Sequence, residues 1–137
     1  MQPIFDTPRL RLEPRTLADL EDCLAMDRDP HVTRFIPGPW ADPVAHRAFV
    51  LARMTAEYPQ GLGYWTIRAR TGRTFFGWVL LIPVAGADAE LEIGWRLVRS
   101  AWGQGYASEA AAPILAHARS VPADRLIVAD IHPAHVG

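Results

Sequence analysis

One strand-to-helix junction constrains this chain more than any other feature. A strand-like stretch over residues 90–98 leads through Trp102-Gly103-Gln104-Gly105 into an alanine-rich helical pattern over residues 105–120. Glycine lets a backbone approach another group closely, and the first turn of a helix has N–H groups without intrahelical partners at its positive end. The junction therefore predicts a binding site for an anionic group at the start of this helix.

The glycine spacing favours a pyrophosphate, but not in either common nucleotide loop. A dinucleotide-binding loop needs a third glycine within a βαβ unit, whereas Gly105 is followed by Tyr106-Ala107 and no parallel-strand pattern precedes it. A Walker loop needs Gly-Lys-Ser/Thr, and the sequence contains no lysine. A plain turn at the start of a helix is an equal alternative, because a lone Gly-x-Gly is a weak motif.

The remaining patterns predict short strands and two earlier helices. Strands are expected over residues 9–13, 64–70, 74–83, 90–98 and 126–131. Capping residues predict helices over about 16–26 and 42–58, before the one over 105–120. The order β-α-α-β-β-β-α-β indicates an α/β (α+β) fold, a mixed and mainly antiparallel sheet flanked by helices.

Three segments spread along the chain carry a family resemblance: residues 7–12, 29–34 and 102–107. The third resembles the acetyl-CoA loop of the GCN5-related N-acetyltransferase (GNAT) superfamily, Gln/Arg-x-x-Gly-x-Gly/Ala. Gly105 and Ala107 match this pattern, whereas Trp102 stands where Gln or Arg is usual. The Trp-Gly-x-Gly-Tyr-Ala form and the two other segments are similar to the branch that acetylates the N-termini of ribosomal proteins.

The resemblance implies a single acetyltransferase domain over residues 1–137 that moves an acetyl group from acetyl-CoA to a primary amine. The amine would belong to a protein N-terminus or to a small molecule, and no metal is implied. Backbone groups of the fourth strand are expected to bind the pantetheine arm, among them those of Trp95, Leu97 and Val98. The pyrophosphate is expected on the loop formed by Trp102, Gly103, Gln104, Gly105, Tyr106, Ala107 and Ser108.

Two glutamates are candidates for the general base. Related enzymes often use a glutamate of the fourth strand, which favours Glu92 and, failing that, Glu90. Alternation with the neighbouring aliphatic residues equally allows both to face solvent. Trp40 and Trp65 are candidates for shaping the acceptor pocket, although packing is the commoner role of such aromatic residues.

Composition argues against several other functions. The net charge of −1 gives no electrostatic footprint for nucleic acid or an acidic membrane surface. The chain shows no signal peptide and no apolar run of about 20 residues, and its single cysteine, Cys23, fits a buried apolar position in a cytoplasmic protein. All fourteen basic residues are arginine, which suggests a bacterial source rich in GC.

The last residues resemble the start of the family's second CoA motif. We expect the usual last helix and strands, and the tyrosine that acts as general acid in many relatives, to be missing after Gly137. His132 and His135 are weak candidates for metal ligands because no third ligand is evident.

Two function classes stay open, an active enzyme and a catalytically impaired CoA-binding remnant or interaction module. Without those last strands, the expected strand over residues 126–131 would have an uncovered edge, which predicts a homodimer or larger assembly.

Overall fold

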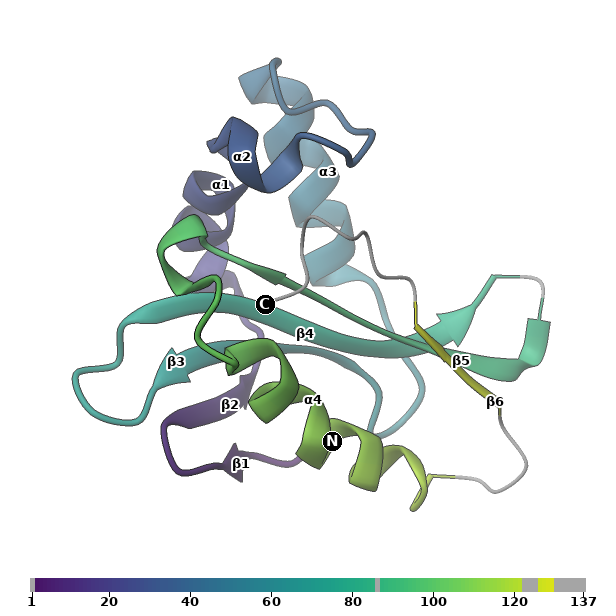
Figure 1. Ribbon diagram of the computed structural model, residues 1–137. Coiled ribbons are helices and arrows are strands. Elements are labelled where there is room, and N and C mark those ends of the chain that lie inside the picture. Colours follow the sequence, from purple (N-terminus) through teal and green to yellow (C-terminus); the bar gives the residue numbers. More distant parts are fainter. Residues whose placement is uncertain (1, 86, 122–125, 130–137) are drawn as a thin grey trace.

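The computed structural model describes residues 2–85, 87–121 and 126–129 of the chain. A six-stranded sheet runs through it in the order β1-β2-β3-β4-β5-β6 (Figure 1). Its strands span Phe5–Asp6, Leu10–Pro14, Gly63–Ala69, Phe75–Val84, Ala87–Leu97 and Leu126–Ala129. Neighbouring strands are antiparallel as far as β5, and β6 runs parallel to β5. The expected mixed, mainly antiparallel α+β fold is confirmed.

Helices cover both faces of the sheet (Figure 1). Helices α1 (Leu20–Arg28), α2 (Pro30–Thr33) and α3 (Pro43–Thr55) lie on one face, and α4 (Tyr106–Ala118) lies on the other. The period-two alternation of the strands supplies a separate hydrophobic core to each face. The sheet is thus the middle layer of three, and a site on one face is separated from a site on the other by a single strand thickness.

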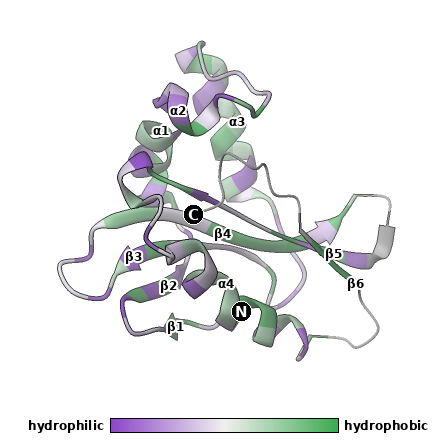
Figure 2. Ribbon diagram, viewed as in Figure 1, coloured by the Kyte–Doolittle hydropathy of each residue, from purple (hydrophilic) through white to green (hydrophobic). Residues whose placement is uncertain are grey.

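Strand β4 contributes alternate side chains to the two hydrophobic cores. Val79 and Leu81 are fully buried toward α4, whereas Trp78 and Leu80 pack toward α1 and α3. A strand covered on both faces is a nearly continuous apolar run, and Figure 2 shows the green of apolar residues along much of β4.

Local capping signals set the helix starts at the expected places. The Thr16 hydroxyl accepts a hydrogen bond from the Ala18 N–H, and the Asp19 carboxylate accepts one from the Thr16 N–H. This capping box begins a 3-10 turn, which passes into α1 at Leu20. Asp42 caps α3, whose first residue is Pro43.

The structure differs from the sequence expectations in several elements, and β5 begins three residues earlier than expected, at Ala87 rather than Glu90. The structure adds β1 and α2, which have two and four residues and are too short to show a period. It also ends α3 at Thr55 rather than near residue 58. Ala56 is extended, with ψ of 143°, and the Tyr58 ring then packs on the Tyr64 ring at 6.1 Å between centroids. Tertiary packing of that tyrosine thus accompanies the earlier end of the helix.

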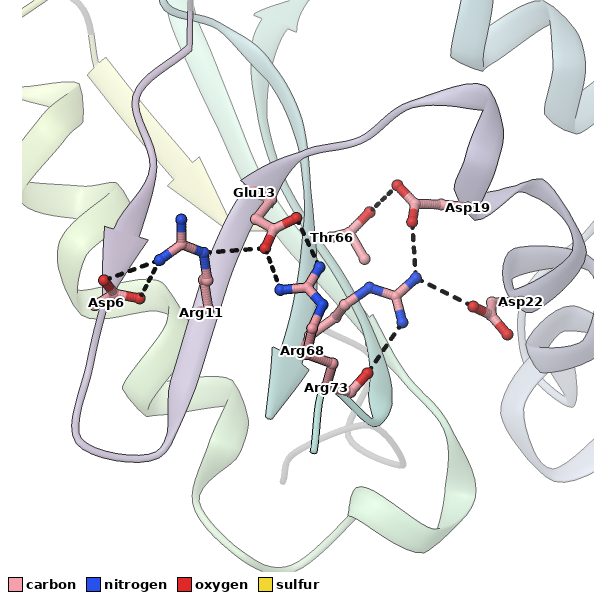
Figure 3. A network of polar contacts seen from close by, with 8 residues as sticks. All are labelled: Asp6, Arg11, Glu13, Asp19, Asp22, Thr66, Arg68 and Arg73. Carbon is pink, nitrogen blue, oxygen red and sulfur yellow. Dashed lines mark hydrogen bonds and ion pairs between the residues drawn. The ribbon is translucent and has the colours of Figure 1, made fainter. Parts of the chain in front are cut away.

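A polar network fastens the start of α1 to strands β2 and β3 (Figure 3). Asp19, which is 8% exposed, accepts hydrogen bonds from the Thr66 hydroxyl at 2.8 Å and from Arg68 Nη2 at 2.9 Å. The network continues through Asp6, Arg11, Glu13, Asp22 and Arg73. These bonds order the β2 side of the sheet.

Candidate active site

The glycine-bearing junction forms a tight loop at the N-terminus of α4. Gly103 and Gly105 have φ values of +73° and +79°, which residues with side chains rarely adopt. Gly105 is the N-cap residue, and it makes no side-chain hydrogen bond to the helix end. Both glycines and Gln104 between them are exposed. The loop therefore presents the N–H groups of a helix start to the surface, where they can bind an anion.

The larger side chains of this loop make contacts that stabilise the loop rather than point toward a ligand. Trp102 Nε1 donates to the Leu97 carbonyl at 3.0 Å, and Gln104 Nε2 donates to a carbonyl one turn back at 2.8 Å. The Tyr106 ring stacks on a phenylalanine ring of β4, with centroids 4.6 Å apart. The loop therefore offers a ligand mainly its backbone.

Glu109, in the first turn of α4, ties the loop to the segment before β2. Its carboxylate accepts hydrogen bonds from the Thr7 hydroxyl at 2.5 Å and the Arg9 N–H at 2.9 Å, and it pairs with Arg9 Nε at 2.6 Å. Arg9 Nη1 donates to the Gln104 carbonyl at 2.9 Å, and its guanidinium lies 4.4 Å from the Tyr106 ring centroid. The first and third of the resembling segments thus meet, a contact that the sequence did not predict.

An apolar cleft of about 480 Å³ opens beside the loop between β5, β6 and α4. Its walls include Ile93, Trp95, Ser108, Ala111, Leu115 and Ile127. Within the described residues, β6 pairs with β5 from Glu90 to Ile93. Among the described residues, the edge of β5 from Gly94 to Leu97 therefore has no partner strand.

Hydrogen bonding shows which main-chain groups of β5 face this open edge. The Val98 N–H donates to the Phe76 carbonyl of β4, and the Val98 carbonyl accepts a bond from the following turn, so both groups are used within the protein. Peptide groups alternate in direction along a strand, so those of Trp95 and Leu97 point to the edge. The Leu97 carbonyl is bound there by the Trp102 indole. A ligand extended along this edge would meet the backbone of Trp95 and the N–H of Leu97.

Glu92 lines a second cavity, on the opposite face of the sheet. This helix-side pocket of about 280 Å³ lies between the sheet and helices α1 and α3. Alternate positions of β5 serve the two cavities, because Ile93 and Trp95 line the cleft whereas Glu92 and Arg96 line the pocket. Glu92 is half-buried in this wall rather than on the outer surface. Glu90 lies two positions further from the loop.

A buried charge network supports the wall of the helix-side pocket. Asp27 is 3% exposed, and its carboxylate lies 2.8 Å from Arg96 Nη1 and 3.1 Å from His46 Nε2. The Arg96 guanidinium lies 5.2 Å and 5.1 Å from the ring centroids of Trp40 and Trp78. No local pattern could have shown this network, because 69 positions separate Asp27 from Arg96.

The two tryptophan candidates have different positions. Trp40 lines the helix-side pocket, whereas Trp65 is fully buried in the core against α4 and donates from Nε1 to the Pro3 carbonyl. Trp65 is therefore a packing residue. Burial raises the pKa of the Cys23 thiol to about 11, so the thiol stays protonated at neutral pH, and its expected apolar role is confirmed.

No helix in the described part of the chain is long and apolar enough to cross a membrane. Across residues 2–85, 87–121 and 126–129, no three His, Cys, Asp or Glu side chains gather as metal ligands would. The candidates His132 and His135 lie outside the described residues, as does the end of the chain at Gly137.

The fold places an exposed helix start beside the edge of β5 in a mixed sheet, an arrangement that can bind an anion. Residues 9–137 match the family described as the acetyltransferase (GNAT) domain. The chain therefore belongs to the GNAT acetyltransferase domain family.

Known proteins resemble the chain over most of its length. The GNAT-family acetyltransferase from Bacillus anthracis has a TM-score of 0.74 and 23% identity, over 96% of this chain and 75% of that one. An acetyltransferase from Agrobacterium tumefaciens has a TM-score of 0.71 and 24% identity, over 87% and 68%. The FsC-acetyl coenzyme A-N(2)-transacetylase of Aspergillus fumigatus is 29% identical over 126 residues, 85% of this chain. The chain spans about half the length (53%) of that curated relative.

Proposed function

We propose that this chain transfers an acetyl group from acetyl-CoA to a primary amine, which attacks the thioester directly. One observation carries the proposal: the anion site, the open strand edge and the Glu92 pocket follow one another along residues 92–108. Acetyl-CoA has its pyrophosphate, pantetheine arm and thioester in the same order. The molecule can therefore lie along β5 with its reactive end near Glu92.

The binding roles divide between the loop and the strand. The pyrophosphate would take N–H groups of the loop from Gly103 to Ala107, and the hydroxyl of Ser108 at the cleft wall would add a donor. The pantetheine would bond to the backbone of Trp95 and Leu97, and an N–H at this edge would stabilise the charge that develops on the thioester oxygen. Val98 contributes packing, because its own main-chain groups are bonded within the protein.

The position of Glu92 favours it as the general base. Of the two described carboxylates that line the helix-side pocket, Asp27 is 3% exposed, whereas Glu92 is half-buried and more accessible to a ligand. Glu92 is the carboxylate at the strand that separates this pocket from the cleft. It would accept a proton from the acceptor's ammonium group, directly or through water, and leave a neutral amine. The amine nitrogen would then form a bond to the thioester carbonyl carbon as the carbon–sulfur bond breaks, and the CoA thiolate would take up the second proton that the nitrogen loses.

The acceptor in this proposal is the amine of a protein N-terminus or of a small molecule. The Trp-Gly-x-Gly-Tyr-Ala form of the loop from Trp102 to Ala107 favours the ribosomal-protein branch. A catalytically impaired CoA-binding remnant is the alternative. The carboxylate behind the proposed thioester position favours the enzyme, since a remnant has no use for it.

Acetyl-CoA binding to two matched glycine variants tests the proposal. Gly105 and Gly72 have similar φ values, +79° and +82°, and Gly72 lies in the distant β3–β4 turn with nothing within 4 Å of an added Cβ. Gly105→Val and Gly72→Val should therefore cost similar stability, about 1–2 kcal/mol. Only Gly105→Val should lower the acetyl-CoA affinity measured by calorimetry, by about tenfold or more, because its side chain blocks backbone approach. Unchanged affinity in a folded Gly105→Val protein would refute the site.

A further inference from the structure

From the charges of the helix-side pocket we infer that the acceptor amine carries a carboxylate, bound by Arg15 and Arg53 at the end of the pocket away from β5. This inference rests on the proposed function for the identity of the pocket as the acceptor site. Both arginines line this pocket and also the small cavity of about 70 Å³ next to it. They lie on different elements, Arg15 just after β2 and Arg53 on α3.

Arg15 is a cation that has no anionic partner within the part of the chain that the structure describes. Its backbone N–H donates to the Tyr64 carbonyl at 3.0 Å, and its guanidinium lies 3.8 Å from the centroid of the Tyr64 ring. Its Nη2 is buried with no hydrogen-bond partner. Among the described residues Arg15 forms no ion pair, whereas Arg96 in the same pocket is paired with Asp27. Withdrawing a guanidinium from water without a carboxylate is costly, and stacking on a ring offsets only part of the cost.

The nearest titratable neighbours do not supply the missing charge. Cys23 is close enough for Arg15 to act on its thiol, but burial raises that pKa to about 11, so the thiol is neutral. Arg53 lies over the Phe49 ring at 4.5 Å and forms no ion pair within the described part of the chain. Two cations that have no carboxylate partner among the described residues therefore border one end of the pocket, which suits a bidentate carboxylate ligand.

The strand register gives the distance from this end of the pocket to the backbone of β5. Tyr64, Leu80 and Gly94 are neighbours across β3, β4 and β5, and Arg15 is bonded beside Tyr64. Three strand spacings therefore separate the Arg15 and Gly94 backbones, about 14 Å. The space between is walled by aromatic and aliphatic side chains, including Trp78 and Leu80. The acceptor that fits is elongated, with an amine at Glu92, an apolar middle and a carboxylate at the arginines.

A pair of model ligands tests the inference without relying on turnover. We would titrate the 137-residue chain with para-(aminomethyl)benzoate and with benzylamine, which differ by the carboxylate. Binding would be followed by the change in tryptophan fluorescence, to which the pocket residues Trp40 and Trp78 contribute. The carboxylate ligand should bind about tenfold more tightly or better, as expected for a charge-assisted hydrogen bond. Equal affinities for the two ligands would overturn the inference.

Arginine variants then locate the carboxylate. Arg53→Gln changes an exposed side chain, so it should fold, and Arg15→Gln removes the buried cation. Each should abolish most of the preference for the carboxylate ligand and leave benzylamine binding unchanged. Arg47→Gln is the control, because it removes the same charge from α3 at a side chain that is 53% exposed and paired with Glu21. A preference that survives in Arg53→Gln and in folded Arg15→Gln would overturn the inference, as would its loss in Arg47→Gln.

Acetyl-CoA calorimetry on the same samples separates this inference from the proposed function. Failure of wild-type protein to bind acetyl-CoA would refute the proposed function, while a carboxylate preference that depends on the arginines would still support the anion site. Acetyl-CoA binding without any carboxylate preference would refute the anion site alone.

Discussion

The two faces of β5 carry sites that are built in different ways. On the α4 face, one continuous stretch supplies the helix cap, the loop and most of the cleft, and the proposed ligand contacts are largely backbone groups. On the other face, the pocket takes its charged side chains from α1, α3, β5 and the end of β2. A backbone site suits a ligand that stays the same, and a side-chain site suits one that differs between relatives. Substitutions should therefore affect the two sites separately.

Asp27→Asn should give the largest effect, a loss of unfolding free energy. It should disturb the helix-side pocket and leave the α4 face unchanged. The change leaves Arg96 and the buried His46 without their carboxylate, and loss of one partner of a buried ion pair costs about 3 kcal/mol or more. Denaturant unfolding would measure this loss, while calorimetry should show acetyl-CoA affinity unchanged within about twofold. Asp22→Asn on the same helix is the control, because its carboxylate is 48% exposed and should contribute less than about 1 kcal/mol. Similar losses in both variants would contradict the buried network.

Glu92→Gln should give the next largest effect, on catalysis rather than stability. Loss of the base should lower kcat/KM by about 10²-fold near neutral pH and change the pH profile, while acetyl-CoA affinity stays the same. Glu90→Gln is the matched control on the same face of β5, and it should keep nearly full activity. Full activity in both single variants and in the double variant at every pH would show that neither glutamate is the base.

The same division explains what the sequence could predict. The capping box at Thr16, the cap at Asp42 and the positive φ at Gly105 depend on neighbouring residues, so their patterns predicted the helix starts and the loop. Strand alternation likewise predicted the central sheet. The proposed cofactor contacts belong to this local class, and they stay a prediction until binding is measured.

The helix-side pocket could not be predicted because its contacts are long-range. Arg15 reaches Tyr64, and Asp27 reaches Arg96, only after strands and helices have packed. A single sequence contains no local pattern that predicts a contact between residues so far apart along the chain. Trp65 shows the same limit, because its burial against α4 rather than in the pocket depends on which face of β3 it occupies.

The smallest effect should come from Glu109, which joins the local loop to a distant segment. Desolvation raises the pKa of Glu109, but hydrogen bonds from Thr7 and Arg9 outweigh it, so the pKa is below its ordinary value. Because the folded pKa is lower than the unfolded one, the carboxylate stabilises the fold at neutral pH. That contribution is lost as pH falls through the folded value, below about 4.5.

The unfolding free energies of wild type and Glu109→Gln, compared across pH, test this expectation. The difference should be about 1 kcal/mol at neutral pH and should shrink in the acid range below the ordinary glutamate pKa. Thr7→Val removes one donor, so it should raise the pKa of Glu109 and move the loss toward higher pH. Acetyl-CoA affinity should fall a fewfold in Glu109→Gln, because Arg9 no longer anchors the loop at the Gln104 carbonyl as firmly. A difference in stability that does not change with pH would show that the Glu109 charge plays no part in holding the loop.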